Sequence, residues 1–546
     1  MRQVCSCWRV CSRGLYSCYW RESSSSQRKM SCCWLSFVTV VSLLSLCWLY
    51  ICLITFNDQE ELNGQLFKWL NRWFNWFMVI IIFSAVLTSY CVLLLLFALI
   101  QIVFGEKLDL HWLHKIFLFL GVIIIIGGIS GIVGMWKREL PTISLSLQAT
   151  APFLQFGAVA ALTLISSFVF QAFHKIKKNS RFLVLVLFAA VAAAIFLSPL
   201  SIHSPCFIEL KDLPEKPKLF AHRGAPMLAP ENTMMAFERS VACGVTAFET
   251  DVQLSKDRIP FLMHDSENEF LLRTTNVKNK LPQRAIKSNM DLTFEEIQNL
   301  NAGEWFLKTD PFRSVSQLSE EEKQTARNQT VPSLLQLLEL AKQHNISVIF
   351  DLYRTHKDRN DREDTAAIID TIRKSNINPG LILWLPPSER EWVNKTSPGF
   401  VHIYSNESEM RKNNGRHLNV RYTHLSMNRI RELRADNITV NLWVVNERWL
   451  FSLLWCAGAS SVTTNSCHLL KDVEQPDWFM SYQTYTIIWI VVDVVSVLIM
   501  AALFFCQWKT HCSRLREGRN RNERSSNFSV GDLATFPFLS SRAMPD

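Results

Sequence analysis

Six long apolar blocks constrain the fold of this chain more than any other feature of its sequence. Each is close to the ~20 residues that an α-helix needs to cross the hydrocarbon core of a membrane. Because backbone groups in lipid must be hydrogen-bonded within their own segment, each block is predicted to be a transmembrane helix. The blocks run from Trp34 to Phe56, Trp76 to Phe104, Ile116 to Trp136, Pro152 to Phe173, Phe182 to Leu200 and Tyr485 to Phe505.

The basic residues predict how these helices are oriented. Clusters of Lys and Arg occupy the N-terminal tail, residues 174–181 and the C-terminal tail. Short basic loops stay on the cytosolic side, so the first helix is predicted to begin in the cytosol. The chain is then a multi-pass membrane protein with both termini cytosolic, and residues 201–484 are extracellular or lumenal. The plasma membrane is preferred to internal membranes.

The predicted domains follow from this topology. They are a cytosolic Cys- and Arg-rich tail (1–33), five transmembrane helices (34–200), an outward-facing domain (201–484), a sixth transmembrane helix (485–508) and a cytosolic basic tail (509–546). The net charge of +9 gathers at the membrane boundaries, and this excludes nucleic acid as a partner. The tail cysteines are either S-palmitoylated or unmodified thiols. Asp493, the one acid well inside a span, is either functional or a packing contact.

Sequons provide an independent indication of topology. Five Asn-x-Ser/Thr triplets, the acceptor motif of N-glycosylation, lie in residues 201–484. One of them, at Asn345, adjoins a predicted strand, where burial would prevent modification. The protein is therefore predicted to be a glycoprotein whose large polar domain faces outward. The sequons begin at Asn328, Asn345, Asn394, Asn406 and Asn437.

The large polar domain alternates short apolar runs with helical patterns, which indicates βα units around a parallel sheet. Its eight strands fit one closed barrel. Residues 266–329 are too long for a βα connection and are interpreted as an insertion, a solvated flank without a catalytic role. The predicted strands are Lys218–Ala221, Thr246–Val252, Ser347–Leu352, Leu381–Leu385, Phe400–Tyr404, Leu418–Tyr422, Thr439–Val445 and Ser461–Thr464, and the predicted helices include Ser333–His344, Thr365–Ser375, Ser426–Ala435 and Arg448–Ala457.

A carboxylate pair marks the second predicted strand. Glu249 and Asp251 are two residues apart and therefore point to one face, while Phe248 and Thr250 point to the other. Adjacent carboxylates repel one another unless a cation lies between them, and such oxygen ligands suit Mg²⁺ or Ca²⁺. The pair is either a metal site or a salt-bridged pair on an exposed strand.

Two histidines and a third acid lie at neighbouring strand ends. His222 ends the first strand and precedes Arg223 and Gly224, where glycine permits a sharp turn and arginine offers a planar fork for phosphate. His264 ends the extended segment after the acidic strand, and Asp351 ends the third strand. A lone histidine is usually structural, but two beside a carboxylate pair indicate a general acid and base flanking a metal.

The motifs of this region resemble those of a known family. AHRGAPMLAPENTMMAFERSVACGVTAFETDVQLSKDRIPFLMHD is similar to the glycerophosphodiester phosphodiesterase signature, with its HRG, PENT, ET-DV and final HD elements. The resemblance extends from Lys218 to about Leu469. With six flanking spans, the chain resembles the multi-pass vertebrate subgroup of that family, which implies a TIM-barrel phosphodiesterase facing outward.

The resemblance also implies roles for individual residues. His222 and His264 become the acid/base pair, with His264 alternatively on the metal. Glu249, Asp251 and Asp351 become ligands of a divalent cation, Mg²⁺ or Ca²⁺.

A second group of residues would bind the substrate. Arg223 holds the phosphate, and Glu231 and Asn232 of PENT lie beside the site and order it. The attacking group is water or the substrate's own glycerol hydroxyl, which would give a cyclic phosphate that water later opens.

Several positions depart from the family pattern. Asp351 stands where Glu is usual, and Tyr353 stands where Lys is usual, although Arg354 is adjacent. Arg258 replaces the glycine of a turn, and Asn465 replaces an aspartate after the last strand. These differences would alter rate or substrate more readily than abolish activity.

Two functions therefore compete. The first is metal-dependent hydrolysis of glycerophosphodiesters, such as glycerophosphocholine, glycerophosphoinositol or a lipid-derived glycolipid anchor, at the outer membrane face. The second is a catalytically weak or silent barrel that serves as a surface binding or signalling module. The intact His222, Glu249, Asp251 and His264 favour the enzyme.

Overall fold

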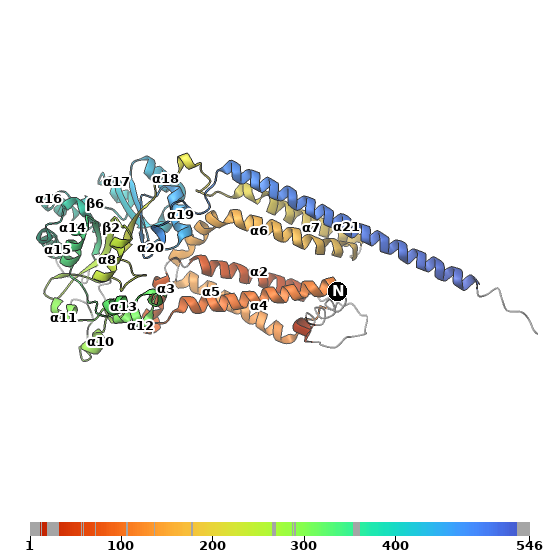
Figure 1. The fold of residues 1–546 in the computed structure, drawn as a ribbon, viewed down its shortest axis with the longest axis horizontal. Coiled ribbons are helices and arrows are strands. Elements are labelled where there is room, and N and C mark those ends of the chain that lie inside the picture. The colour runs from red at the N-terminus through yellow and green to blue at the C-terminus, as the bar shows by residue number, and fades with distance from the viewer. Residues whose placement is uncertain are drawn as a thin grey trace, which may run out of the picture. The chain divides into compact units, whose positions relative to one another are not determined.

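A computed structural model describes residues 11, 14–18 and 32–531, apart from positions 56, 58, 71, 105–107, 136, 176–177, 265–268, 285, 287, 289–290 and 353–360. The chain divides into two compact units, one within residues 1–149 and 204–481 and the other within residues 150–203 and 482–546. Figure 1 follows the elements from red at the N-terminus to blue at the C-terminus. The predicted fold class, a TIM barrel with an insertion attached to about six apolar helices, is confirmed.

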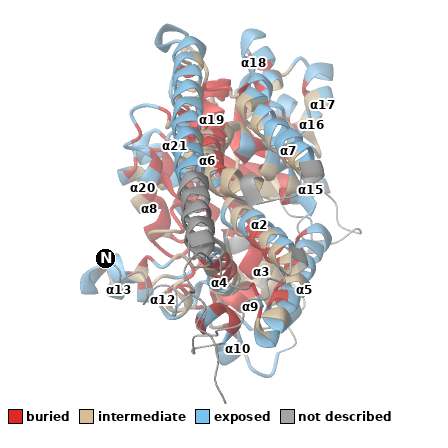
Figure 2. Cartoon of the chain, turned by 90° about the vertical axis from the view of Figure 1, so that its right-hand side faces the viewer, coloured by how far each residue is buried: buried red, intermediate tan, exposed pale blue. Residues whose placement is uncertain are grey.

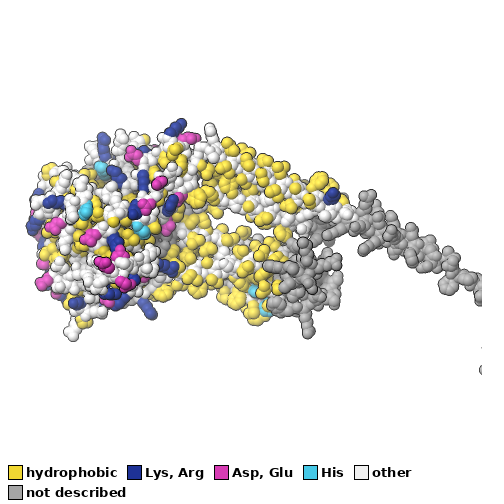
Figure 3. Space-filling view, in the orientation of Figure 1, with side chains coloured by type: hydrophobic (Ala, Val, Ile, Leu, Met, Phe, Trp, Pro, Cys, Tyr) yellow, Lys and Arg dark blue, Asp and Glu magenta, His cyan; other side chains and the backbone are white. Residues whose placement is uncertain are grey.

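Six helices in the described part of the chain are long and apolar enough to cross a membrane. Hydrophobic side chains gather over them in Figure 3, while charged side chains gather over the barrel. The fourth begins earlier than predicted, at Leu140, so that Pro152 lies inside the helix and not at its start. The six are α2 (Cys32–Thr55), α4 (Trp76–Phe104), α5 (Trp112–Met135), α6 (Leu140–Lys175), α7 (Lys178–Leu197) and α21 (Tyr482–Gly531), and a short helix α3 (Gln59–Leu70) follows α2.

The second unit holds most of α6 together with α7 and α21. The hydroxyls of Thr163 and Ser496 lie 2.7 Å apart, and the Phe170 and Phe504 ring centroids are 5.3 Å apart. The indole N–H of Trp489 donates to Asp493 Oδ2 at 2.6 Å. Asp493 therefore makes a packing contact within its own helix, in agreement with the second of the two interpretations of this residue.

Eight parallel strands form the barrel, in the order β6-β5-β4-β2-β1-β9-β8-β7. Tyr404, just after β6, pairs with Leu418 of β7 and closes the ring. A short strand that the sequence did not predict, β3, runs antiparallel to β2. The strands are β1 (Lys218–His222), β2 (Ala247–Leu254), β3 (Pro260–Leu262), β4 (Ser347–Leu352), β5 (Ile382–Trp384), β6 (Val401–His402), β7 (His417–Arg421), β8 (Thr439–Trp443) and β9 (Ser461–Thr464).

A helix follows each parallel strand. The first, α8, begins after Thr233, whose hydroxyl accepts from the Ala236 N–H. A capping box of Ser333 and Gln336 starts α14 in the same position of the next βα unit. These barrel helices are α8 (Met234–Ala242), α14 (Leu334–His344), α15 (Asp361–Ser375), α16 (Arg390–Thr396), α17 (Glu407–Lys412), α18 (Met427–Ala435), α19 (Arg448–Ala457) and α20 (Cys467–Leu470).

Between β3 and α14, the described residues include five short helices, and three of them, α9 to α11, contribute to a hydrophobic cluster separate from the main core, with Phe261, Leu271, Val277 and Ile297 fully buried in it. They are α9 (Glu269–Thr274), α10 (Val277–Lys280), α11 (Phe294–Gln298), α12 (Glu304–Thr309) and α13 (Glu320–Arg327).

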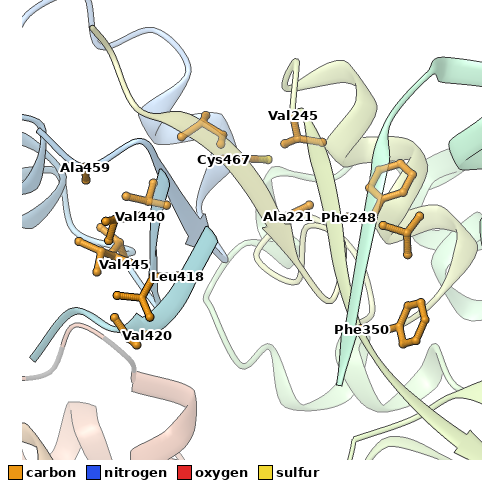
Figure 4. Packing of buried hydrophobic residues seen from close by; sticks show 14 of the residues in the cluster. Ala221, Val245, Phe248, Phe350, Leu418, Val420, Val440, Val445, Ala459 and Cys467 are labelled. Atoms are coloured by element: carbon orange, nitrogen blue, oxygen red, sulfur yellow. The ribbon is translucent and has the colours of Figure 1, made fainter. Parts of the chain in front are cut away.

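The main core lies between the strands and their helices. Phe248 of β2 and Phe350 of β4 lie on the same side of the sheet in Figure 4. Phe248 meets Phe237 of α8, with ring centroids 5.3 Å apart, and Phe350 meets Trp384 of β5 at 5.5 Å. Because side chains alternate along a strand, this outward packing turns the intervening residues of β2 toward the barrel axis. Figure 2 shows exposed residues on α17 and α18 and buried residues around α19.

Two disulfides that were not predicted from the sequence join distant segments of the barrel domain. Cys206, ahead of β1, is bonded to Cys456 of α19. Cys243, after α8, is bonded to Cys467 of α20. Both bonds join segments more than 200 positions apart in sequence, and closing such long loops restricts the unfolded chain.

Within the first unit, residues at the ends of three of the long apolar helices contact the barrel. Asn57, after α2, bonds to the loop that follows β8. Trp73, before α4, packs on Trp305 of α12, with ring centroids 5.7 Å apart. Glu139, after α5, accepts from Arg421 and Tyr422 at the end of β7. All three contacts lie on segments that follow the carboxyl ends of strands, the face where TIM barrels carry their active sites.

Candidate active site

Strand register brings four of the predicted site residues to one place. His222 of β1 is paired with Glu249 of β2, and Asp251 of β2 is paired with Asp351 of β4. β1, β2 and β4 are adjacent, so all four residues end up at the carboxyl edge of three neighbouring strands. Their side chains are largely buried, with Asp251 at 3% exposed.

His222 is hydrogen-bonded to Asn465, the residue after β9. Its Nδ1 lies 2.6 Å from the Asn465 side-chain oxygen, so Nδ1 carries the proton in that hydrogen bond. Its Nε2 lies 3.8 Å from Glu249 Oε2. Burial, and then the charge of Arg223, lower the pKa of His222 to about 3. The imidazole is therefore neutral, and Nε2 is an acceptor that faces the site.

His264 reaches the site because β3 doubles back along β2. The Met263 N–H donates to the Asp251 carbonyl at 3.0 Å, and this bond places the next residue, His264, with Nε2 at 4.0 Å from Asp251 Oδ1. The ring of Phe270 lies against the imidazole at a centroid distance of 4.3 Å. His222, at the end of β1, and His264, just after β3, thus both lie beside the carboxylates of β2.

Arg223 occupies the sharp turn after β1. Its backbone has a φ of 52°, and Gly224 follows with a φ of 86°. The turn directs the guanidinium inward, where Nε lies 3.2 Å from Asp251 Oδ2 and Nη1 lies 3.4 Å from Glu231 Oε2. The planar cation is 9% exposed beside the carboxylates, a suitable position for binding a phosphate group.

The PENT residues lie directly behind Arg223. Asn232 bonds to the Arg223 carbonyl through its N–H at 3.0 Å and accepts from the Thr250 hydroxyl at 2.9 Å. Glu231 is 7% exposed and accepts from both Arg223 and Arg273, the latter at 2.6 Å. Both residues therefore hold the turn in place from its buried side.

The donor chemistry fits a divalent cation. Burial raises the pKa of Glu249 well above its usual range, and the Asp251 and Asp351 carboxylates add to the rise. Burial, followed by Asp251, likewise raises the pKa of Asp351. A hard cation would relieve this repulsion. Among the residues that the structure describes, however, no three His, Cys, Asp or Glu side chains are already gathered as a metal site.

The residues that depart from the family pattern make different contacts in the structure. Asn465 retains a role, since it bonds to His222. Arg258 has a φ of 64°, the conformation that favours glycine, and its side chain pairs with Glu363 and Asp364 of α15 at 2.9 and 3.0 Å. Tyr353 and Arg354 lie outside the described residues, as does Asp265 of the HD motif.

The sequence did not predict what the insertion contributes. Its Phe270 packs on His264, and its Arg273 is buried with 3% of its side chain exposed. The interpretation of residues 266–329 as only a solvated flank is therefore wrong at α9. No sequence signal marked Arg273, because its partners Glu231 and Trp73 lie far from it along the chain.

Comparisons with known proteins agree with the motifs. The sequence model of the glycerophosphoryl diester phosphodiesterase family matches residues 222–469. The glycerophosphoinositol inositolphosphodiesterase GDPD2 of Mus musculus is 41% identical over 92% of this chain and 93% of its own. The glycerophosphodiester phosphodiesterase domain-containing protein 5 of Homo sapiens is 37% identical over 91% of this chain and 83% of its own.

Among solved structures, a phosphodiesterase of Oleispira antarctica in complex with the product sn-glycerol-3-phosphate is 19% identical, with a TM-score of 0.38 over 47% of this chain and 95% of that chain. The sequence relatives are matched over most of both chains. The chain therefore belongs to the glycerophosphoryl diester phosphodiesterase family and is a phosphoric diester hydrolase, as its motifs predict.

Proposed function

We propose that this chain hydrolyses glycerophosphodiesters in a metal-dependent reaction in which His222 and His264 transfer the protons. The observation that carries the proposal is the strand register that gathers His222, Glu249 and Asp251 with Asp351 at one edge of the barrel. His264 returns to the same edge through β3. The relatives named for glycerophosphoinositol make that diester the first substrate to test.

In the proposed reaction, neutral His222 acts as the base. Its Nε2 removes the proton from the attacking hydroxyl, and the oxygen forms a bond to phosphorus. The bond between phosphorus and the departing oxygen breaks, and His264 gives a proton to that oxygen. When the attacking group is the substrate's glycerol hydroxyl, the product is a cyclic phosphate that water opens in a second step.

Arg223, and a cation held by the carboxylates, would balance the negative charge of the diester. Arg223 binds a phosphate oxygen, and Glu231 and Asn232 keep the guanidinium in position. Glu249, Asp251 and Asp351 would hold Mg²⁺ or Ca²⁺, with His264 as an alternative ligand. The cation would neutralise the phosphate and polarise it for attack.

We propose further that the barrel faces the extracellular space or a lumen, at the plasma membrane in preference to internal membranes. Two disulfides support an oxidising compartment. The five sequon asparagines are all exposed, including Asn345, whose expected burial is wrong. The barrel also contacts the ends of α2, α4 and α5 that the N-in topology places outside.

A substrate panel tests the catalytic proposal. The full-length protein in lipid nanodiscs is incubated with glycerophosphoinositol or glycerophosphocholine, with Mg²⁺, with Ca²⁺ or with chelator. Phosphomonoester and alcohol should appear only with metal, and His222→Ala and His264→Ala should each lower kcat by roughly 10²-fold or more, the usual contribution of a general acid or base.

Binding without turnover of any diester under every metal condition would contradict catalysis and favour a surface binding module. Retention of wild-type kcat by His222→Ala would contradict the assigned base.

A further inference from the structure

Asn57 follows the transmembrane helix α2 and is buried in a loop of the barrel. Its Nδ2 donates to the Val444 carbonyl at 2.5 Å, and its Oδ1 accepts from the N–H groups of Asn446 and Glu447 at 2.8 and 3.2 Å. The residue is 2% exposed. Both ends of the amide are thus bonded to the segment after β8, so this side chain fixes the conformation of that segment.

Asn446 extends the connection from α2 toward β9. Its Nδ2 donates to the Asn57 carbonyl at 3.0 Å, which turns the amide oxygen toward Asn465. The Asn465 N–H donates to that oxygen at 2.8 Å, and the Ser466 hydroxyl donates to the Asn446 carbonyl at 2.7 Å. Asn446 therefore bonds to two successive residues of the β9 end.

Asn465 completes the series at the active site. It is 1% exposed, and its side-chain oxygen lies 2.6 Å from His222 Nδ1. The hydrogen bonds run without a gap from Asn57 through Asn446 and Asn465 to His222. In the first two steps a side-chain amide oxygen accepts from the backbone N–H of the next residue, so the position of one residue restricts the position of the next.

We infer that Asn57 is a positioning residue for His222, and that the outer end of α2 orients the imidazole through Asn446 and Asn465. This inference rests on the proposed role of His222 as the base. A base must lie within hydrogen-bond reach of the proton it removes, and a small misplacement of a reacting group lowers the rate of the chemical step. Asn57 belongs to a transmembrane helix end, so the complete active site requires the membrane part of the chain.

A second contact between a helix end and the barrel, at Glu139 and Thr142, provides a control. The Thr142 hydroxyl lies 3.2 Å from Glu139 Oε2 and 3.0 Å from the Tyr422 hydroxyl. This contact is buried, as that of Asn57 is, and it joins Thr142 to Glu139 and to Tyr422 beside β7, not to the end of β9. Thr142→Val therefore disturbs the contact of this residue with Glu139 and Tyr422 without disturbing the Asn57 series.

The test measures kcat and KM of full-length variants in nanodiscs with glycerophosphoinositol and metal. Asn57→Ala should lower kcat by roughly 10- to 100-fold, the range for residues that orient a functional ligand, with little change in KM. Asn57→Asp keeps the acceptor for the Asn446 and Glu447 N–H groups but loses the donor to the Val444 carbonyl, so it should recover only part of the rate. Thr142→Val should keep the wild-type kcat.

A double-variant measurement separates positioning from general destabilisation. Asn57→Ala combined with Asn465→Ala should be no slower than Asn465→Ala alone, because both act through His222. Asn446→Asp, which keeps its oxygen but loses the donor to Asn57, replaces Asn57→Ala if that variant does not fold, and it should also lower kcat.

Wild-type kcat in Asn57→Ala or Asn446→Asp, with His222→Ala inactive, would overturn the inference alone. An equal loss in Thr142→Val would also overturn it. Full activity of His222→Ala would instead contradict the proposed function.

Discussion

Arg273 shows how a single residue of the insertion supports the site. Its guanidinium donates to Glu231 at 2.6 Å and lies over the ring of Phe270 at 4.2 Å, of Trp305 at 4.6 Å and of Trp73 at 5.1 Å. Burying a cation is costly unless it is paired, and here a carboxylate and three aromatic faces replace the lost water. Because Glu231 also accepts from Arg223, Arg273 shares a carboxylate with the proposed phosphate-binding residue.

We expect Arg273→Ala to lower the free energy of unfolding by about 3–5 kcal/mol, since it leaves a carboxylate buried with one partner fewer. Arg239→Ala is the matched control. Its guanidinium pairs with Glu322 at a site where 35% of the arginine side chain is exposed, so its loss should cost less than about 1 kcal/mol. Denaturant unfolding of both purified variants measures the difference, and equal costs would show that the insertion arginine is not a buried charge partner.

At the scale of elements, the turn from β1 to α8 determines where Arg223 points. Gly224 has a φ of 86°, and a Cβ added there would lie 2.7 Å from the backbone carbon and the Cβ of Ala236 in α8. The helix therefore packs directly on the turn. Only glycine combines this backbone conformation with the close approach of α8.

We expect Gly224→Ala to lower the stability of the barrel by about 2–4 kcal/mol, from backbone strain together with overpacking. Gly244→Ala separates the two contributions. Gly244 has a φ of 73°, but a Cβ there would meet nothing within 4 Å, so only the conformational cost of about 1–2 kcal/mol applies. The free energies of unfolding of the two variants should differ accordingly, and a Gly224→Ala cost no larger than that of Gly244→Ala would rule out the close contact.

At the scale of the whole molecule, three contacts within the first unit bear on the predicted topology. Asn57, Trp73 and Glu139 belong to connections that the N-in topology places on one side, and all three contact the barrel. Residues 174–181 and the C-terminal tail, which are rich in basic residues, are predicted to lie on the other side. The C-terminal tail also contains a sequon, Asn527-Phe528-Ser529.

We expect endoglycosidase treatment to increase the electrophoretic mobility of the cell-expressed protein. Replacement of Asn328, Asn394, Asn406 and Asn437 by Gln should remove most of that shift. Asn527→Gln is the control and should leave it unchanged, because a cytosolic sequon does not meet the glycosylation machinery. A shift that depends on Asn527 and not on the barrel sequons would reverse the predicted topology.

The sequence by itself determined the spans, the barrel and the motif residues. The reason is that these depend on local pattern: apolar length for the helices, alternation for β2, and the short spacing of His222, Arg223, Glu249 and Asp251. Predicted strands such as Ser347–Leu352 and Ser461–Thr464 match the observed bounds.

Only the tertiary structure decided which distant residues complete the site. From the sequence, Asn465 was only a departure from the family's aspartate, whereas in the structure its side-chain oxygen lies 2.6 Å from His222 Nδ1. Arg273 looked like part of a solvated flank until Glu231, Trp73 and Trp305 were seen around it. Asn57 had no motif at all. These contacts depend on barrel closure and on the packing of span ends, which bring together residues separated by hundreds of positions, and no local pattern records such a distance.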